Sequence, residues 1–148
     1  MRRGVLPLIG SGIELVERPP CALRPILLEP RIDAVNRRLG GKRILGVGRR
    51  GKRVVVEVEG QEFLVIEPRM TGLVLLADPP DHEHLRLKLH LTGGSSRQLL
   101  FWDRRGLGTV RLMRAAEIAR LVDQKLGIDA LQITSEQLRQ RLMRSRRA

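Results

Sequence analysis

Aromatic residues, cysteines and long apolar runs are all scarce in this sequence. Phe, Trp and Tyr make up 2% of the 148 residues, which disfavours a general single-strand binder, because such proteins stack bases on several rings. The one cysteine, Cys21, excludes an internal disulfide and a cysteine-based zinc cluster. No apolar run approaches the roughly 20 residues that span a bilayer, and residues 5–9 are too short for a signal-peptide core. We therefore expect a location in the cytosol or nucleoid.

Acidic residues are few relative to basic ones. The chain has 28 Lys and Arg residues against 16 Asp and Glu, a formal net charge of +12. Such an excess indicates the kind of partner, with nucleic acid as the first candidate and an anionic membrane surface as the second. With 42% hydrophobic residues, the chain is long and apolar enough to bury the core of one domain.

An alternation of apolar and polar residues fills the middle of the chain. It predicts strands over residues 13–17, 43–48, 53–58, 63–66, 71–76, 84–91, 98–102 and 109–113. Valines 54, 56 and 58 share one face, and leucines 85, 87, 89 and 91 share another. Opposite these leucines, a basic outer face is expected from His84, Arg86, Lys88 and His90. Seven or eight short strands predict a mainly β fold, an antiparallel sandwich or a barrel.

Helical patterns are expected only on either side of the strands or between the first two. A helix end is expected within residues 1–9, closed by Gly10 and Gly12. Further helices are predicted over residues 31–39, 115–126 and 134–144. The last of these opens with a capping box, and its basic end suggests that the chain normally continues.

Two glycine-rich loops gather basic residues. The first, residues 48–52, is a strand–strand turn that carries Arg49 and Lys52. Another, residues 103–108, carries Arg105 and Leu107 between glycines, which would allow close approach to a phosphate backbone. On composition alone, each loop is also compatible with a solvated basic turn.

A third loop, residues 68–72, places Met70 beside a basic residue. A methionine at a loop tip can be a wedge that enters the DNA base stack, as in base-flipping proteins. The alternative is a methionine that fills a gap in the core. The sequence alone leaves both interpretations open.

His82 and His84 stand two residues apart at an expected strand start. Without a third ligand in view, no metal site is expected. His82 is a better candidate for donating a hydrogen bond to phosphate. The sequence also offers no paired carboxylates that present themselves as an acid–base set.

These loops, in this order and spacing, resemble those of formamidopyrimidine-DNA glycosylases. Lys52 falls on the family's β-hairpin lysine, and residues 70–72 are similar to its Met-Ser/Thr-Gly loop. Further resemblances are to its Arg-Arg-Gly helix end, His-x-His strand, Asp-Pro-Arg-Arg-Phe-Gly loop and Leu-Gly-Pro-Glu-Pro-Leu link, at residues 2–4, 81–85, 101–108 and 126–131. Nearly the whole chain is covered. The resemblance implies the family's antiparallel β-sandwich over residues 1–131, with the start of a helical C-terminal region over residues 132–148.

The resemblance also implies an activity, that of a base-excision DNA glycosylase and AP lyase. Such an enzyme flips an oxidised purine, typically 8-oxoguanine or its ring-opened form, out of the duplex. An N-terminal proline amine attacks the sugar C1′ and displaces the base, and the resulting Schiff base allows β- and δ-elimination. In that scheme Lys52 supplies a cation near the sugar-phosphate and a proton during elimination.

Further residues are implied to contact DNA. Met70 would fill the space of the flipped nucleotide, and Arg105 would face the orphaned base with a donor fork that suits cytosine. Leu107 stands where the family has a wedging phenylalanine, His82 would contact the backbone, and Arg49 joins this DNA-binding set. The implied partner is damaged double-stranded DNA, with no membrane and no small-molecule cofactor. The family is usually monomeric.

The sequence departs from the family pattern at several positions. The family begins Pro-Glu-Leu-Pro-Glu directly before Arg-Arg-Gly, whereas this sequence begins Met1-Arg2-Arg3-Gly4, and Gly106 replaces the second loop arginine. We therefore expect a chain cut short at both ends. It would lack the proline nucleophile and the C-terminal zinc finger, hold no cofactor, and show no glycosylase activity as given.

Two alternatives remain from the sequence. A non-catalytic nucleic-acid-binding module of degenerate glycosylase origin would explain the absent nucleophile and the altered wedge residues. A small basic RNA-binding protein would explain the charge alone. The latter predicts no preference for damaged duplex DNA over structured RNA.

Overall fold

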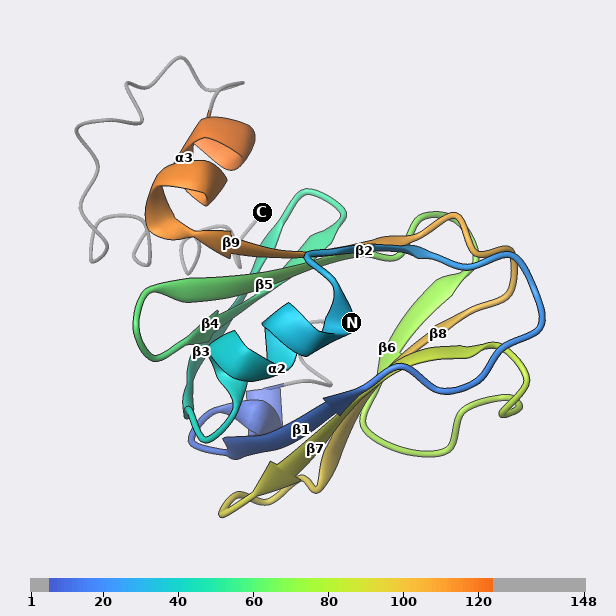
Figure 1. Cartoon of the computed structure of the whole chain (residues 1–148), viewed down its shortest axis with the longest axis horizontal. Coiled ribbons are helices and arrows are strands. Elements are labelled where there is room, and N and C mark those ends of the chain that lie inside the picture. Colours follow the sequence, from blue (N-terminus) through green and yellow to red (C-terminus); the bar gives the residue numbers. More distant parts are fainter. Residues whose placement is uncertain (1–5, 124–148) are drawn as a thin grey trace.

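The computed structural model describes residues 6–123, so the predicted helix over residues 134–144 lies outside the described residues. The described chain forms two β-sheets with helices at their margins (Figure 1). The sequence left open whether the strands form a sandwich or a barrel, and the two separate sheets show that they form a sandwich. Within the described residues, no helix is long and apolar enough to cross a membrane.

The first sheet is antiparallel, with the strand order β1-β7-β8-β6. Its strands are β1 (Gly12–Glu17), β6 (Gly72–Leu75), β7 (Leu85–Thr92) and β8 (Gln98–Asp103). All four were predicted from the alternation. Strand β6 is shorter than expected at both ends, because Thr71 belongs to the preceding turn and Leu76 to the following bend.

The second sheet has the strand order β2-β9-β5-β4-β3. Its strands are β2 (Leu27–Glu29), β3 (Ile44–Arg50), β4 (Arg53–Val58), β5 (Glu62–Glu67) and β9 (Thr109–Arg114). Strand β2 runs parallel to β9 and was not predicted. Three residues between Pro25 and Pro30 are too few to show an alternation.

Three helical segments lie against the sheets. They are η1 (Leu6–Leu8), α2 (Ile32–Leu39) and α3 (Ala115–Asp123). Asn36 of α2 accepts a hydrogen bond at Oδ1 from Val16 N and donates from Nδ2 to Val16 O, both at 2.8 Å. Helix α2 thus satisfies a backbone pair on the edge strand β1, where a further strand could otherwise pair.

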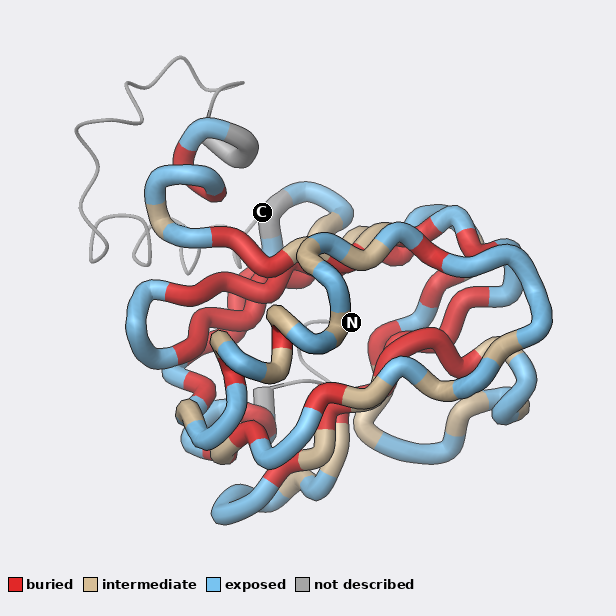
Figure 2. The backbone as a smooth tube through the Cα atoms, viewed as in Figure 1, coloured by how far each residue is buried: buried red, intermediate tan, exposed pale blue. Residues whose placement is uncertain are grey.

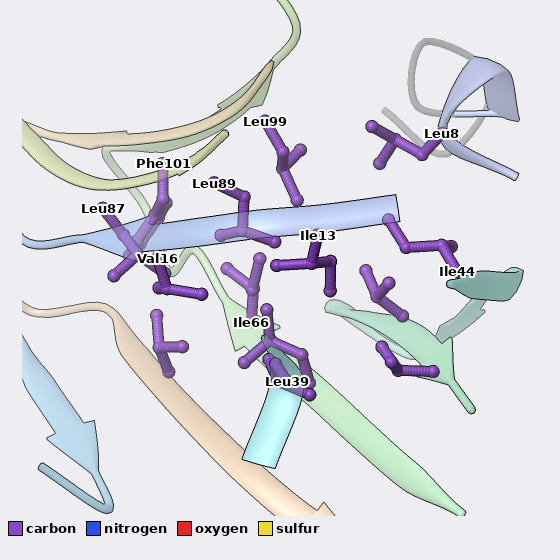
Figure 3. Packing of buried hydrophobic residues seen from close by; sticks show 14 of the residues in the cluster. Leu8, Ile13, Val16, Leu39, Ile44, Ile66, Leu87, Leu89, Leu99 and Phe101 are labelled. Carbon is purple, nitrogen blue, oxygen red and sulfur yellow. The ribbon is translucent and has the colours of Figure 1, made fainter. Parts of the chain in front are cut away.

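The main core lies between the two sheets. Figure 3 shows Leu87, Leu89, Leu99 and Phe101 of the first sheet close to Ile66 of the second. The predicted valine face at 54, 56 and 58 is confirmed, as are leucines 87, 89 and 91, because all six are buried in this cluster. Full burial of one such side chain contributes about 1.5–3 kcal/mol.

A second, smaller core covers the opposite face of the second sheet. Val55, Phe63, Val65 and Met113 pack there against Ile118 of α3. This explains why β4 and β5 are buried along nearly their whole length, which a simple alternation does not predict. In Figure 2 the central strands are largely buried, while the turns at their ends are exposed.

The prediction of a basic outer face on β7 is wrong at Arg86. A bulge between Leu85 and Leu87 breaks the alternation, and Arg86 is only 3% exposed. Its guanidinium donates from Nε to Asp103 O at 2.8 Å and from Nη1 to Arg24 O. Arg86 therefore ties two loops together instead of facing solvent.

One end of the sandwich gathers the turns that the sequence singled out. Arg50 pairs with Arg53, Glu67 with Thr109 and Gly72 with Asp103. The β3–β4 turn, the β5–β6 turn and the β8–β9 loop therefore emerge on the same side, as the turn before β7 also does. We call residues 51–52, 68–71, 81–84 and 104–108 the loop end. The β7–β8 hairpin, residues 93–97, lies at the other end.

Candidate nucleic-acid interface

Lys52 lies at the tip of the two-residue turn that joins β3 to β4. Gly51 has φ +60°, a value that the first residue of such hairpin turns adopts and that glycine tolerates. Lys52 is exposed, and within the described residues it makes no ion pair. Arg49 lies within β3 and not in the loop, and its Nε donates to Gly51 O at 2.8 Å. The turn thus presents an unpaired ammonium to solvent.

Met70 lies at the tip of the turn between β5 and β6. It is 89% exposed, so the alternative of a methionine that fills the core is wrong. Thr71 follows it, and Gly72 then begins β6. A Cβ on Gly72 would lie 2.2 Å from Pro68 O, so this turn closes tightly only with glycine. The fold presents Met70 to solvent on a compact turn.

The β8–β9 loop carries the third group of predicted site residues. Arg104 and Arg105 are exposed, and Leu107 is 39% exposed. Gly106 is buried with φ +71°, and a Cβ there would lie 2.3 Å from Arg24 O. The backbone of the loop is therefore held against the β1–β2 connection, while its cationic and apolar side chains remain accessible.

Asp103, at the end of β8, connects this loop to the Met70 turn. Its side chain is fully buried. Oδ1 accepts from Thr71 Oγ1 at 2.8 Å and from Arg105 N at 3.3 Å, while Oδ2 accepts from Gly108 N at 2.7 Å. Arg105 N also lies 3.4 Å from Thr71 Oγ1. We call Asp103, Thr71 and the two backbone amides the clasp.

His82 is exposed in a turn before β7, and this turn replaces the strand start that the sequence predicted. Asp81 holds the turn, because its Oδ1 accepts from His84 N at 2.9 Å and from Trp102 Nε1 at 3.2 Å. His84 Nδ1 lies 2.9 Å from the same oxygen. The backbone N–H of His84, helped by its ring and by the Trp102 indole, lowers the pKa of Asp81 from 3.8 to about 2.

Asp81→Asn is expected to destabilise the domain at neutral pH and to lose that effect in acid. The pKa of Asp81 is lowered in the folded state, from 3.8 to about 2. The ionised carboxylate therefore stabilises the fold above the unfolded pKa, and this stabilisation is lost as the pH falls through the folded pKa. Thermal unfolding between pH 6 and pH 2 measures it, with Asp78→Asn in the neighbouring exposed turn as control. A gap between Asp81→Asn and the parent chain that stays constant down to pH 2 would contradict this assignment.

Positive charge dominates the exposed side chains of the loop end. Lys52, Arg69, Arg104 and Arg105 are exposed there, against the exposed carboxylate of Glu83. Of the nearby carboxylates, Glu67 lies 3.4 Å from Arg53 and 3.7 Å from Arg69, and those of Asp81 and Asp103 are engaged as described. Arg24, Arg69 and Leu107 line a shallow groove of about 500 Å³ between the β1–β2 connection and the loops. Such a surface attracts polyanions.

The described residues include no group of three or more His, Cys, Asp or Glu side chains that could hold a metal ion. The His84 ring stacks edge-on against Trp102 at 5.6 Å and faces Asp81, while His82 is exposed.

The fold brings the predicted residues to one end, and it adds residues that the sequence did not assign. Lys52, Met70, His82, Arg105 and Leu107 all lie on loop-end turns. Sequence reasoning gave no role in these loops to the polar groups behind them, which are the buried Arg86 and Asp103 and the partly exposed Thr71 and Asp81. A carboxylate directly after an apolar strand and before a glycine-rich loop was the available signal for Asp103, since such loops need acceptors for their free amides.

Together, fold and loops define a two-sheet β domain with a cationic end that exposes Met70 and Leu107. The protein-family model for the formamidopyrimidine-DNA glycosylase N-terminal domain matches residues 1–110 of the sequence. The chain belongs to this family.

Relatives and solved structures agree with this assignment. The chain is 35% identical to the formamidopyrimidine-DNA glycosylase of Bacillus subtilis, in a match that covers 100% of the chain and 54% of that protein. It is 34% identical to the Herpetosiphon aurantiacus enzyme, over 88% of the chain and 50% of that protein. The Chloroflexus aurantiacus match, at 35% identity, covers 66% of the chain and 35% of the relative. The chain thus spans about half the length of its relatives or less.

Similar structures include the Lactococcus lactis formamidopyrimidine-DNA glycosylase bound non-covalently to DNA that contains an AP site. The TM-score is 0.67 and the identity 25%, covering 84% of this chain and 46% of that one. A complex of the Lactococcus lactis enzyme with DNA that contains an abasic site has a TM-score of 0.65 at 25% identity, over 85% of this chain and 45% of that one.

Proposed function

We propose that the loop end binds damaged duplex DNA, as part of a base-excision DNA glycosylase and AP lyase that acts on oxidised purines. The observation that carries this proposal is Met70, a large apolar side chain that is 89% exposed among cationic loops. In water such a side chain makes few stabilising packing contacts. It can, however, insert into a DNA base stack that the surrounding cations hold nearby. The relatives' shared name supports the class of reaction.

Basic side chains in and beside the loop end would bind the sugar-phosphate backbone. Lys52 and His82 are exposed at turns, and Arg49 lies on the strand that leads to the Lys52 turn. Contacts of this kind position a protein on DNA without reading its sequence, and they weaken as salt rises. Lys52 would also stabilise the phosphate at the lesion and donate a proton during elimination. Its unpaired ammonium on a two-residue turn suits both tasks.

Three side chains would act on the bases. Met70 would occupy the space that the flipped nucleotide leaves, and Leu107 would wedge beside the orphaned base. Arg105 would hydrogen-bond that base, because its planar guanidinium presents several donors to the acceptors of cytosine. The Met70 turn and the Arg105 loop are neighbours through the clasp, so these contacts can be made at one site.

Binding by the chain is tested with a duplex that contains a tetrahydrofuran abasic-site analogue opposite cytosine. Fluorescence anisotropy would compare it with an intact duplex of the same sequence over a range of salt concentrations. We expect tighter binding to the abasic-analogue duplex, and for both a logarithmic salt slope of about −0.9 for each phosphate contacted. Equal affinity for intact DNA, or for structured RNA, would overturn the proposal.

Met70→Ala is expected to weaken binding to the abasic-analogue duplex about tenfold, or about 1.4 kcal/mol, because alanine is too short to fill the space beside the unstacked bases. Its effect on the free energy of unfolding should stay within about 0.5 kcal/mol, because the side chain is exposed. Leu15→Ala, at an exposed apolar position on β1, is the matched control. Equal losses in the two variants would show that Met70 has no particular role.

A second proposal concerns the chain by itself, which we expect to bind DNA without excising bases. The family's reaction begins with a proline amine. Pro7, the first proline in the sequence, has no free amine, and its carbonyl lies 3.4 Å from Ser95 Oγ at the end opposite Lys52. Borohydride trapping on an 8-oxoguanine duplex tests this. The expected result is no covalent adduct, and a trapped adduct would contradict it.

A further inference from the structure

We propose that Asp103 is a positioning residue that couples the Met70 turn to the Arg105 loop, so that both enter the DNA as one unit. The coupling would set how well the protein distinguishes damaged from intact duplex. This inference rests on the proposed function of the loop end. It assigns to a buried carboxylate a part in recognition, although the carboxylate itself would touch no DNA.

Asp103 accepts hydrogen bonds from three residues that belong to the candidate DNA contacts or directly follow them. Its Oδ1 accepts from Thr71, the residue directly after Met70, at 2.8 Å. The same oxygen accepts from the amide of Arg105 at 3.3 Å, and Oδ2 accepts from Gly108, directly after Leu107, at 2.7 Å. One carboxylate thus holds the side chain of the residue after Met70, the backbone amide of Arg105 and the backbone amide of the residue after Leu107.

The chemistry of the clasp requires a carboxylate. An ionised carboxyl group only accepts hydrogen bonds, and both of its oxygens here face donors. An asparagine amide would turn an NH2 group toward at least one backbone N–H, in either orientation. Because Asp103 is fully buried, water cannot take over the lost bond. The backbone of the loop is also close, since a Cβ on Gly108 would lie 3.0 Å from Asp103 Oδ2.

Coupling matters only where both loops must act together. On intact duplex the cationic loops can bind phosphates independently of each other. At an abasic gap, Met70 and Leu107 would enter neighbouring spaces while Arg105 meets the orphaned base. Loops that are held in register before binding lose less conformational freedom on entering the gap. Cutting the clasp should therefore weaken damaged-DNA binding more than binding to intact DNA.

Thr71→Val is the sharpest variant, because Asp103→Asn can fail to fold. Valine keeps the shape of threonine but removes the hydroxyl that links the Met70 turn to Asp103. The bonds from Arg105 and Gly108 to Asp103 remain, while the 3.4 Å contact from Arg105 N to the Thr71 hydroxyl is lost with it. Thr71→Ser restores the hydroxyl, and Thr92→Val, at the exposed far end of β7, controls for a threonine-to-valine change elsewhere.

The measured quantity is the ratio of affinities for the abasic-analogue and intact duplexes, determined for the whole 148-residue chain. We expect Thr71→Val to lower this ratio about fivefold, which is the smallest change in affinity that is typical of coupling between two sites. The affinity for the intact duplex should change little. Thr71→Ser should restore the parent ratio, and Thr92→Val should leave it unchanged. A duplex with 2-aminopurine beside the gap should show weaker unstacking with Thr71→Val, a signal that lower stability alone would not produce.

The outcomes separate the coupling from the function on which it rests. If the parent chain shows no preference for the gap, the proposed function and the coupling both fail. If the parent chain discriminates and Thr71→Val discriminates equally well, only the coupling is overturned. A Thr71→Val chain that is less stable but keeps its ratio also overturns it, since the clasp would then be merely structural.

Discussion

Gly72→Ala is expected to destabilise the domain by about 3 kcal/mol and to displace the Met70 turn. A Cβ at this position would lie 2.2 Å from Pro68 O and 2.7 Å from Pro68 Cα. Both atoms are backbone, so no side-chain rotation relieves the contact. Gly72 also pairs with Asp103 in the β6–β8 ladder, which prevents it from moving away without breaking the sheet. The turn that presents Met70 therefore depends on this glycine.

Urea unfolding, followed by the fluorescence of Trp102, would measure the effect. Gly93→Ala is the matched control, because Gly93 has φ +75° but open space around its Cα. It should lose only the cost of a left-handed conformation, about 1 kcal/mol. Equal losses in the two variants would show that the close approach at Gly72 is not what constrains the turn.

Arg105→Ala is expected to weaken binding to the abasic-analogue duplex by about 10- to 100-fold, the range for loss of a well-placed arginine–base contact. The fold should be almost unaffected, because the side chain is exposed. Only the backbone N–H of Arg105 takes part in the clasp, and alanine retains it. Anisotropy titrations against duplexes with cytosine or adenine opposite the gap would measure the effect and its dependence on the orphaned base.

Arg97→Ala separates this base contact from a general loss of charge. Arg97 is exposed on the β7–β8 hairpin, at the other end of the sandwich. Its removal changes the net charge equally and should cost less than threefold in affinity, as expected for a distant surface charge. If Arg97→Ala and Arg105→Ala weakened binding alike, the interaction would depend on net charge and not on the loop end.

The strands of both sheets were largely predictable, because burial imposes an alternation on the sequence. Leucines 87, 89 and 91 and valines 54, 56 and 58 all face the core as expected. The bounds of β4 agree with the prediction at both ends. The exposed turns were also predictable, since glycines and cations mark them, but the sequence left open whether Met70 is exposed or fills the core.

The buried polar groups behind the tips could not be predicted in the same way. Charged residues are rarely buried, so Arg86 was expected on an exposed face. Its burial depends on a bulge in β7 and on carbonyls of residues 24 and 103. The role of Asp103 depends on Thr71, 32 positions away. Such contacts follow from how the two sheets meet and leave no periodic signal.

The parallel strand β2 could not be predicted from the sequence either. It has three residues and lies beside β9, far along the chain. Its hydrogen bonds, not a local pattern, define it. The connection that leads to β2 carries Arg24, whose carbonyl receives the Arg86 guanidinium, so this unpredicted element supports the loop end from behind.

The most direct test of the loop end as the DNA-binding surface is to map amide NMR signals of the isotope-labelled chain. Spectra would be recorded with and without the abasic-analogue duplex. The predicted result is that signals of residues 49–52, 69–72, 82–84 and 104–108 shift or broaden, while those of residues 93–97 stay unchanged. Changes centred on residues 93–97, with the loop end unaffected, would contradict the assignment of the interface.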